Sequence, residues 1–389
     1  MGKPVGPFNR KAVVVTGELS GELHALHLIT AINETLPFQW SAIGSETLRR
    51  SGVELIYDYR SISLTGLSEV FSKMGQISKA YKALKEHLRE TSPALLILVD
   101  FPGFNLRVAA IARRLGIPVV YFIPPQVWAW RKSRILKIKR DVGLVICILP
   151  FEKKLYDDHA VPCVYVGHPF MQTVRPSLPG TAFLSELGLE KKRPIITIMP
   201  GSRKNEIAKH LPVMLQVIDR LRQDLKEMAV LLPVAENIER HFVESFLAAS
   251  HGIHLLDGAS HDALASSDIA LIASGSATLE AAILGCPAVV IYRVSAFSYL
   301  AARLLVHVDY ISLPNVISAK EVFPEFIQEL DPETIAERVL HMLNNETTRL
   351  KQEMEAVRAK LGTVDSYGLA RDAVIRFLEQ CYGPLPETS

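Results

Sequence analysis

Two carboxylates follow short apolar segments of the sequence. Asp100 comes directly after Leu95–Val99, and Glu18 lies three residues after the run that ends at Val15. A carboxylate at the end of a buried parallel strand stands in the crevice where α/β proteins bind ligands, and there it can act as a general base or bind a hydroxyl group. The alternative is that Asp100 caps the following turn, or that Asn105 caps the following helix.

Glu18 belongs to the segment TGELSGE, residues 16–22, in which two glycines and a serine open a predicted helix. Their backbone N–H groups could face an anion or a sugar. The segment lacks the GxGxxG spacing of dinucleotide-binding proteins, and no acidic residue ends a second strand about 20 positions later. The alternative is an ordinary tight turn between a strand and a helix.

Two turns in the second half of the sequence have residue types that suit a phosphate. Gly201, Ser202 and Arg203 follow the apolar run Ile195–Met199, with Arg203 in the first turn of a predicted helix. A cation at a helix N-terminus is disfavoured by the helix dipole, whereas a bound phosphate would favour it. We therefore interpret this turn as an anion site rather than a plain turn.

The other turn follows Ile269–Ala273 and is rich in hydroxyl groups. Glu280 stands one helical turn further on, where its carboxylate could accept hydrogen bonds from the two hydroxyls of a ribose. Two such turns favour a nucleoside diphosphate, and the absence of GxxxxGK[ST] from the sequence argues against nucleoside triphosphate hydrolysis. The alternative is ordinary helix capping, with Glu280 favourably placed in the helix dipole. The residues of this turn are Ser274, Gly275, Ser276, Ala277 and Thr278.

The elements that must position these residues are short apolar runs that alternate with amphipathic stretches. This rhythm predicts an α/β fold of doubly wound parallel sheets. A segment rich in proline at residues 169–180 separates two halves, and the chain after Pro332 reads as purely helical. We predict α/β domains at residues 1–175 and 185–365 and a last helix at 366–389. Two such halves usually bind their ligand between them.

Composition and charge exclude several classes of protein. With 389 residues, 49% of them hydrophobic, the chain can bury the cores of two domains and is neither disordered nor a disulfide scaffold. A net charge of +2 provides no overall field for nucleic acid. Cys147, Cys163, Cys286 and Cys381 form no CxxC pair, so we expect reduced, mostly buried thiols in a cytosolic protein without a metal site.

Membrane crossing is not expected, but two segments suggest a surface partner. The run ending at Val15 is too short for a signal peptide, and no uncharged apolar stretch reaches a membrane span. Residues 131–140 are strongly basic and follow Trp128 and Trp130, which suits nucleic acid, an anionic membrane or a phosphorylated ligand, or else a solvated helix beside buried tryptophans. Residues 64–77 carry an apolar stripe near lysines, which is either core or a membrane-docking ridge.

Seven motifs in this order resemble those of bacterial lipid-A-disaccharide synthases, a glycosyltransferase family with the GT-B fold. The motifs span nearly the whole chain: GELSGEL, DFPGFN, PPQVWAWR, FEKKLYDDHAVPCVYVGHP, PGSRKNEI, SGSATLEAAILGCP and YISLPN. The resemblance implies two Rossmann-like domains that face a central cleft, with C-terminal helices that return to the first domain. It also implies a peripheral protein on the cytoplasmic face of the inner membrane, and exchanged dimers in some members.

The implied reaction transfers 2,3-diacylglucosamine from its UDP adduct to 2,3-diacylglucosamine 1-phosphate. The product is the β(1→6)-linked lipid A disaccharide 1-phosphate, the anomeric centre is inverted, and UDP leaves. The family needs no metal ion or other cofactor. Its partners are these two lipid substrates and the membrane surface, not nucleic acid.

The resemblance also assigns roles to individual residues. Asp100 and Glu18 match acidic residues of the acceptor half, with Asp100 our first choice for the base, and Arg203 matches the arginine that neutralises the leaving diphosphate. Inverting transfer needs such a base and such a positive charge. The matches on the donor side are Gly201, Ser202, Ser274, Gly275, Ser276, Ala277 and Thr278 for uridine diphosphate, Glu280 for the ribose, and Asn315 near the donor.

The sequence departs from the family pattern at three positions. Leu19 and Glu22 replace an alanine or threonine and an aspartate, and Gly103 replaces the second aspartate of DxPDFN. The missing carboxylate favours Asp100 as the base, with Glu18 and His168 as alternatives.

Three other functions remain open from the sequence. The first is a GT-B transferase or epimerase acting on a soluble UDP-sugar, which predicts that residues 64–77 are buried. The second is a nucleic-acid-binding module that uses the basic segment, and the third is a UDP-sugar binder without catalysis. Four retained residues argue against the third: Glu18, Asp100, Arg203 and Glu280.

Overall fold

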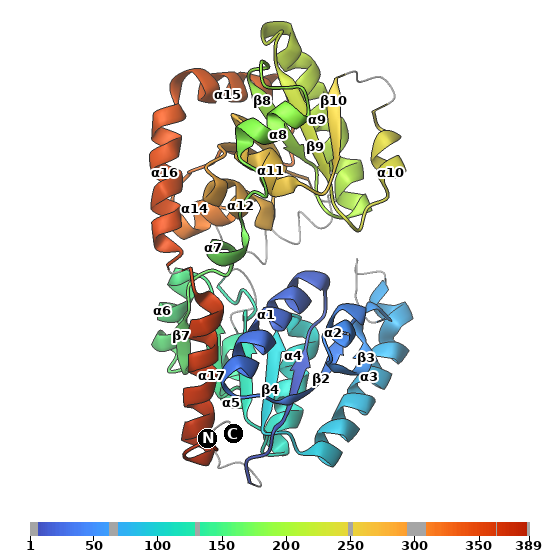
Figure 1. The fold of residues 1–389 in the computed structure, drawn as a ribbon, viewed down its shortest axis with the longest axis vertical. Coiled ribbons are helices and arrows are strands. Elements are labelled where there is room, and N and C mark those ends of the chain that lie inside the picture. The colour runs from blue at the N-terminus through green and yellow to red at the C-terminus, as the bar shows by residue number, and fades with distance from the viewer. Residues whose placement is uncertain are drawn as a thin grey trace. The chain divides into compact units, whose positions relative to one another are not determined.

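The computed structural model describes residues 7–61, 69–128, 133–247, 252–293, 309–362 and 364–386. The chain divides into two compact units (Figure 1). Unit 1 comprises residues 1–169 and 363–389, and unit 2 comprises residues 170–362. Among the described residues, no helix is both long enough and apolar enough to cross a membrane.

Unit 1 is built on a seven-stranded parallel sheet with the order β3-β2-β1-β4-β5-β6-β7. Its central strands are rich in valine, leucine and isoleucine and are buried on both faces, as expected for strands covered by helices on both sides. The strands are β1 (Lys11–Val15), β2 (Gln39–Gly44), β3 (Glu54–Asp58), β4 (Leu95–Val99), β5 (Val119–Phe122), β6 (Leu144–Cys147) and β7 (Cys163–Tyr165).

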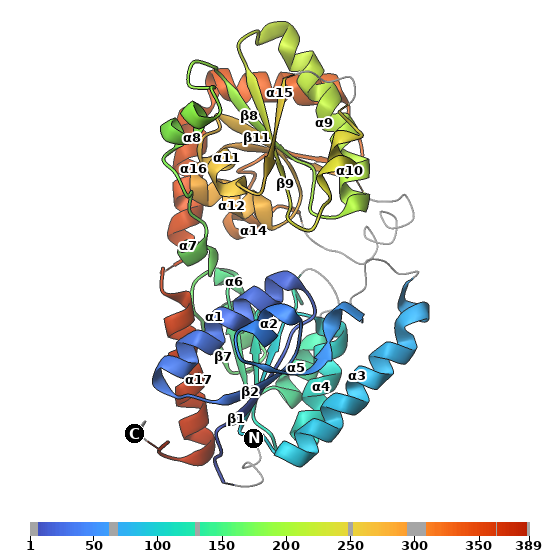
Figure 2. The same ribbon diagram turned by 45° about the vertical axis from the view of Figure 1, so that its right-hand side comes forward.

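Helices form a layer on each face of this sheet (Figure 2). Right-handed crossovers place the helices that lead outward through β2 and β3 on one face and those that lead through β4, β5 and β6 on the other. The last helix of the chain, α17, packs on α1. The helices are α1 (Leu19–Thr35), α2 (Glu46–Arg50), the 3-10 turn η1 (Tyr59–Ser61), α3 (Glu69–Thr91), α4 (Pro102–Arg114), α5 (Arg134–Asp141), α6 (Pro150–Asp158) and α17 (Ser366–Tyr382).

Unit 2 repeats the architecture with a six-stranded parallel sheet of order β10-β9-β8-β11-β12-β13. Its strands are β8 (Ile195–Met199), β9 (Ala229–Val234), β10 (Ile253–Asp257), β11 (Ile269–Ala273), β12 (Ala288–Tyr292) and β13 (Glu325–Ile327). Its helices are α7 (Phe170–Thr173), α8 (Gly180–Glu186), α9 (Lys204–Asp224), α10 (Arg240–Glu244), α11 (Ser260–Ala265), α12 (Ser276–Leu284), α14 (Leu313–Ser318), α15 (Pro332–Asn345) and α16 (Thr347–Lys360).

The predicted fold class, doubly wound parallel α/β, is confirmed, but the pattern of elements was incomplete. Four strands, β2, β3, β7 and β13, were not predicted, because they are interrupted by polar residues or are only three residues long. The sequence pattern predicts one helix over residues 236–249, which is wrong in extent, since α10 is a single short helix at Arg240–Glu244. The same pattern also predicts a helix over residues 295–305, which lie outside the described residues.

Candidate active site

The predicted site residues of unit 1 flank the point where the direction of strand order reverses. From β1 the chain moves outward through β2 and β3, returns to β4 beside β1, and then moves outward the other way. The carboxyl ends of such a strand pair form the usual ligand crevice of a doubly wound sheet. Glu18 follows β1 and Asp100 follows β4, so the topology brings the two carboxylate-bearing turns to neighbouring strand ends.

Asp100 occupies strained backbone. Its φ is 43° and that of Phe101 is 47°, both in the left-handed region that side chains other than glycine rarely adopt. The carbonyl oxygen of Asp100 accepts hydrogen bonds from Asn105 Nδ2 at 2.8 Å and from the Tyr121 hydroxyl at 2.7 Å. These bonds hold the strained turn in place. Strain of this kind concentrates at functional sites, which supports the interpretation of Asp100 as a working residue.

The carboxyl group of Asp100 titrates near the working range of a general base. Burial and the negative charge of Glu18 raise its pKa to about 6, although the backbone N–H of Phe101 opposes the shift. Glu18 itself is exposed, and its Oε1 accepts a hydrogen bond from the Ser20 hydroxyl at 2.9 Å. Asp100 does not cap α4, whose N-cap residue is Phe101, and Asn105 lies inside that helix rather than capping it.

The ring of Phe101 couples the two turns of unit 1. A Cβ atom added to Gly17 would lie 2.2 Å from this ring, which is too close for any side chain. The turn after β1 therefore needs glycine at this position, where it contacts the turn after β4. At Gly103, by contrast, a Cβ atom would meet nothing within 4 Å. The space for the second aspartate of the family motif is therefore present, although the side chain is missing.

Glu22, one of the departures from the family motif, has a structural task. Its fully buried carboxylate accepts hydrogen bonds from the Ser45 N–H and hydroxyl, both at 2.6 Å, and from the Tyr59 hydroxyl at 3.0 Å. A longer bond of 3.3 Å comes from the Leu48 N–H. The side chain thus ties α1 to the ends of β2 and β3 and fixes the turn that carries Glu18.

His168, the alternative base, lies in a buried cluster. Burial and the neighbouring His24 lower the pKa of His168 to about 3. Burial and His27 lower the pKa of His24 to about 4, and its Nδ1 lies 2.8 Å from the hydroxyl of Tyr367 on α17. A neutral histidine with so low a pKa is a weak base, so Asp100 suits proton removal better than His168 does.

The predicted residues of unit 2 flank the corresponding reversal, between β8 and β11. These strands pair directly, with Met199 opposite Ile272, so the two predicted phosphate turns start side by side. His210 supports the first turn: its Nδ1 lies 3.0 Å from the carbonyl oxygen of Pro200, and its Nε2 accepts the N–H of Arg293. His210 was not predicted as a site residue, although it lies in α9, the helix that follows the turn.

Glu206 supplies a negative charge beside Arg203 at the start of α9. Its carboxylate accepts a hydrogen bond from the Ser202 N–H at 3.2 Å and pairs with the Arg203 guanidinium at 2.7 Å. Gly201 has φ +126°, and a Cβ atom there would lie 2.7 Å from Glu206. A carboxylate within the chain therefore already compensates the cation at the start of α9, so the helix-dipole argument does not by itself require a phosphate.

In the turn after β11, some polar groups are hydrogen-bonded within the protein and others are exposed to solvent. The Thr278 hydroxyl donates to the carbonyl oxygen of Gly275 at 2.8 Å, and the Ser274 hydroxyl donates to that of Ile311 at 3.3 Å. Gly275 and Ser276 are exposed, and the N-cap residue of α12, Gly275, supplies no side-chain cap. The N-terminus of α12 thus offers exposed backbone of the kind that binds anions.

Glu280 has an acid–base partner that the sequence analysis missed. His261 Nε2, on α11, lies 3.3 Å from Glu280 Oε2. This hydrogen bond to Glu280 raises the pKa of His261. The carboxylate is 15% exposed, so it remains reachable from solvent while His261 fixes its orientation.

Asn315 is fully engaged within unit 2. Its Oδ1 accepts the backbone N–H groups of Val322 and Phe323 at 2.8 and 2.9 Å, and its Nδ2 donates to the Phe323 carbonyl oxygen and to Glu325. Glu325 also accepts the hydroxyl of Ser312 at 2.7 Å. Asn315 is completely buried, so in this structure it holds the backbone around α14.

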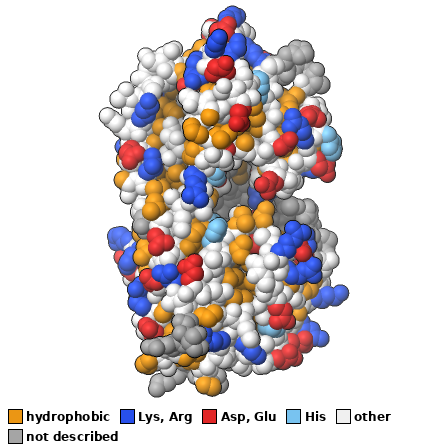
Figure 3. Space-filling model, in the orientation of Figure 1, with side chains coloured by type: hydrophobic (Ala, Val, Ile, Leu, Met, Phe, Trp, Pro, Cys, Tyr) orange, Lys and Arg blue, Asp and Glu red, His pale blue; other side chains and the backbone are white. Residues whose placement is uncertain are grey.

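The surface segments are only partly described. Trp128 packs edge-on against Phe151, with ring centroids 5.1 Å apart, while Trp130 and residues 131 and 132 lie outside the described residues. Of the stripe at residues 64–77, Met74 is exposed, whereas the side chains of residues 64–73 lie outside the description. On the face drawn in Figure 3, cationic and anionic side chains are interspersed, in keeping with the small net charge.

Comparison with known sequences gives a consistent result. The family model described as lipid-A-disaccharide synthetase matches residues 12–368. A lipid-A-disaccharide synthase of Syntrophus aciditrophicus is 40% identical over 362 residues, covering 91% of this chain and 94% of the relative. One of Myxococcus xanthus is 37% identical over 374 residues, covering 95% and 97%.

Solved structures share the fold at low sequence identity. A Staphylococcus aureus MnaA–UDP co-structure has a TM-score of 0.67 at 14% identity, covering 98% of this chain and all of that one. A Neisseria meningitidis UDP-GlcNAc 2-epimerase bound to UDP-GlcNAc has a TM-score of 0.61 at 15% identity, covering 94% and 100%. At such identities the likeness concerns the fold alone.

Proposed function

The chain belongs to the lipid-A-disaccharide synthase family, and we propose that its two units divide an inverting glycosyl transfer between them. The protein is a glycosyltransferase of lipid A biosynthesis. The donor is UDP-2,3-diacylglucosamine and the acceptor is 2,3-diacylglucosamine 1-phosphate. Unit 1 supplies the base for the acceptor, and unit 2 supplies the site for uridine diphosphate.

Asp100 is the base in this proposal. Its carboxylate removes the proton from the acceptor 6-hydroxyl as that oxygen attacks the anomeric carbon of the donor, and the bond from that carbon to the diphosphate breaks with inversion. The observation that carries the assignment is a carboxyl group with a raised pKa, held in strained backbone at the strand reversal of unit 1. Glu18 supports it by raising the pKa, and His168 is too weak a base.

Unit 2 stabilises the leaving diphosphate. The charge that develops on UDP would be met by the guanidinium of Arg203 and by the exposed N-terminus of α12, with Ser202, Gly275 and Ser276 lining the two turns. Glu206 orients Arg203 and Glu280 is available to the ribose hydroxyls. Asn315 acts indirectly in this scheme, by shaping the backbone around α14.

A peripheral association with the cytoplasmic face of the inner membrane completes the proposal. Substrates with two acyl chains reside in a bilayer, so the enzyme must reach its surface. The exposed large hydrophobic side chains among the described residues all belong to unit 1, the acceptor unit. They are Leu19, Leu23, Met74, Leu136, Val364 and Leu369.

The test is release of UDP in detergent micelles from UDP-2,3-diacylglucosamine, with and without the acceptor. We expect acceptor-dependent release and a disaccharide phosphate detected by mass spectrometry. Asp100→Asn should lower kcat by at least about a hundredfold, the usual contribution of a general base, while leaving UDP binding intact. Near-normal turnover by Asp100→Asn would exclude Asp100 as the base. Turnover of a soluble UDP-sugar instead would contradict the lipid substrates.

A further inference from the structure

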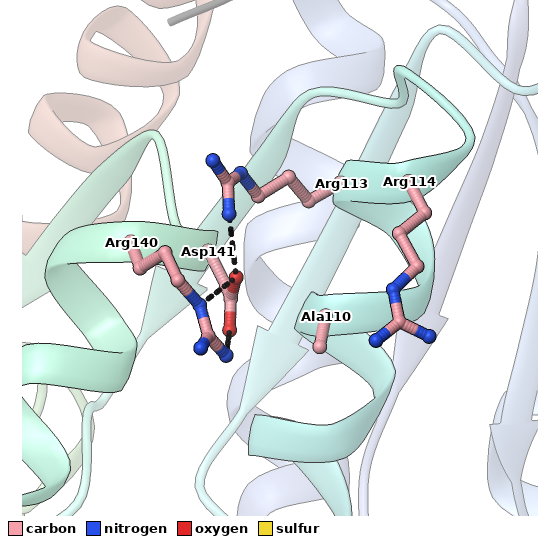
Figure 4. A pocket seen from close by; sticks show the side chains of 5 residues that line it. All are labelled: Ala110, Arg113, Arg114, Arg140 and Asp141. Atoms are coloured by element: carbon pink, nitrogen blue, oxygen red, sulfur yellow. Dashed lines mark hydrogen bonds and ion pairs between the residues drawn. The ribbon is translucent and has the colours of Figure 1, made fainter.

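Three arginines and one buried carboxylate lie on α4 and α5 of unit 1. They line a hollow of about 390 Å³ together with Ala110 (Figure 4). Both helices reach this hollow with their C-terminal ends, which lie at the amino edge of the sheet. Asp100 and Glu18 follow the opposite, carboxyl edge, so the hollow is separate from the candidate active site. The charged residues are Arg113, Arg114, Arg140 and Asp141.

The carboxylate of Asp141 satisfies only part of this positive charge. Arg140 binds it through two hydrogen bonds of 2.8 and 2.6 Å, whereas Arg113 lies 3.5 Å from it. Arg114 makes no hydrogen bond or ion pair with any residue that the structure describes, and its guanidinium stands apart from the pair in Figure 4. Three cations against one anion leave the hollow with two uncompensated positive charges. Since guanidinium groups bind phosphate oxygens in pairs, the hollow suits a phosphate group.

The two helices that border the hollow are cationic along their whole length. Across α4 and α5, PGFNLRVAAIARR and RILKIKRD, the sequence carries seven cations and the single carboxylate of Asp141. The net charge of the whole chain is only +2. The positive charge is therefore concentrated on these two packed helices.

Helix α5 also exposes an apolar side chain to solvent. Leu136 is 65% exposed, more than any other large hydrophobic residue that the structure describes. It precedes Arg140 by one helical turn on α5, while Ile135 and Ile138 face the core. A helix that exposes leucine among lysines and arginines has the composition of a segment that lies in the interface of an anionic bilayer.

We propose that this α4–α5 surface docks on a bilayer of anionic phospholipid, with a lipid headgroup phosphate in the arginine hollow and Leu136 inserted between the acyl chains. Free phosphate would bind the hollow, but it would leave Leu136 without a role. The inference rests on the proposed function only in that a lipid substrate requires a membrane. It adds the surface, the headgroup charge and the residues that meet it.

The experiment is co-sedimentation of the full chain with vesicles of phosphatidylcholine, with or without phosphatidylglycerol as about a third of the lipid. We expect binding to the anionic vesicles that weakens with salt, since each cation near such a surface contributes separately. The double variant Arg114→Gln/Leu136→Ser should bind about tenfold more weakly. Among the described residues neither side chain has a hydrogen-bond or ion-pair partner to lose, so the variant should fold. The control, Arg50→Gln, removes one exposed arginine from α2, elsewhere in unit 1.

The inference is overturned if the control loses as much affinity as the test variant, or if the test variant binds like the wild type. Equal binding to neutral vesicles would also overturn it, as would full displacement by millimolar glycerol 1-phosphate at constant ionic strength, which would indicate a site for free phosphate. Turnover in detergent micelles separates this inference from the proposed function. The test variant should keep wild-type kcat there, and absence of turnover in the wild type would count against the enzymatic assignment alone.

Discussion

Asp100 carries the most specific chemical expectation, because its pKa can be read from a pH profile. A general base works only when deprotonated, so kcat/KM should fall as the pH drops through about 6, the raised pKa of this carboxyl. Glu18→Gln removes a negative charge that contributes to the shift. The pKa of Asp100 should then fall, and the acid limb should move to lower pH even if kcat also declines.

The measurement is kcat/KM in detergent micelles between about pH 5 and pH 8, which brackets the expected limb. Glu46→Gln serves as the control, since this carboxylate pairs with arginines on α2 and lies on another part of unit 1. If the limb stays in place in Glu18→Gln, or moves equally in Glu46→Gln, the titrating group is not Asp100.

Single residues also mark the limit of sequence reasoning. Asp100 and Glu18 could be predicted as neighbours because parallel strands place their carboxyl ends at one edge. Glu206, the partner of Arg203, and His261, the partner of Glu280, were not predicted. Such pairs depend on the three-dimensional conformation of the turns, which the sequence pattern does not define. Asn315 was predicted to lie near the donor, but its side chain bonds to backbone groups just before β13. The apolar pattern did not predict that strand.

At the scale of elements, the packing of α17 on α1 should depend on pH. The folded pKa of His24 is about 4 and that of His168 about 3, both below the ordinary value of 6.5. Between each folded pKa and the ordinary value of 6.5, the unfolded chain binds more protons than the folded chain. The stability that the neutral histidines contribute is therefore complete above about pH 6.5 and is lost as the pH falls toward the folded pKa values. For His24 alone the loss by about pH 5 is on the order of 2 kcal/mol.

The corresponding test compares urea unfolding at about pH 7 and pH 5 for the wild type and His24→Gln. The variant forfeits its bond to Tyr367 at both pH values, but it should lose about 2 kcal/mol less between them. His159→Gln, a change at an exposed histidine on the same unit, should behave like the wild type. A pH dependence in His24→Gln equal to that of the wild type would rule out the partly buried His24 as its source.

The elements themselves were predictable to the degree that they are buried on both faces. The runs that form β1, β4, β8 and β11 are almost purely apolar, and each of these strands lies at the centre of its sheet. The edge strand β3 has no fully buried residue and a charged residue at each end, so its sequence resembles a loop. Sheet edges were therefore lost from the prediction, while the sheet centres that position the candidate site were found.

At the scale of the whole molecule, the two units have different surfaces, and this division should appear in thermal unfolding. The candidate UDP site belongs to unit 2, whereas Asp100 and the exposed apolar residues belong to unit 1. A ligand that binds the folded state stabilises it by an amount set by its concentration and affinity, about 2.7 kcal/mol at a hundred times the Kd. UDP should therefore raise the Tm of the wild type and of Asp100→Asn equally. Arg203→Ala should lose most of the shift, because its guanidinium is expected on the diphosphate.

Arg222→Ala is the matched control for that measurement. Arg222 lies in the last turn of α9, the helix that follows Arg203, and it pairs with Asp219 at 3.1 Å. Its loss should lower the Tm without UDP by the small amount typical of an exposed ion pair, and should leave the UDP shift unchanged. A full UDP shift in Arg203→Ala would move the diphosphate away from the turn after β8. A lost shift in Asp100→Asn would mean that UDP binding also depends on unit 1, and the proposed division of work between the two units would fail.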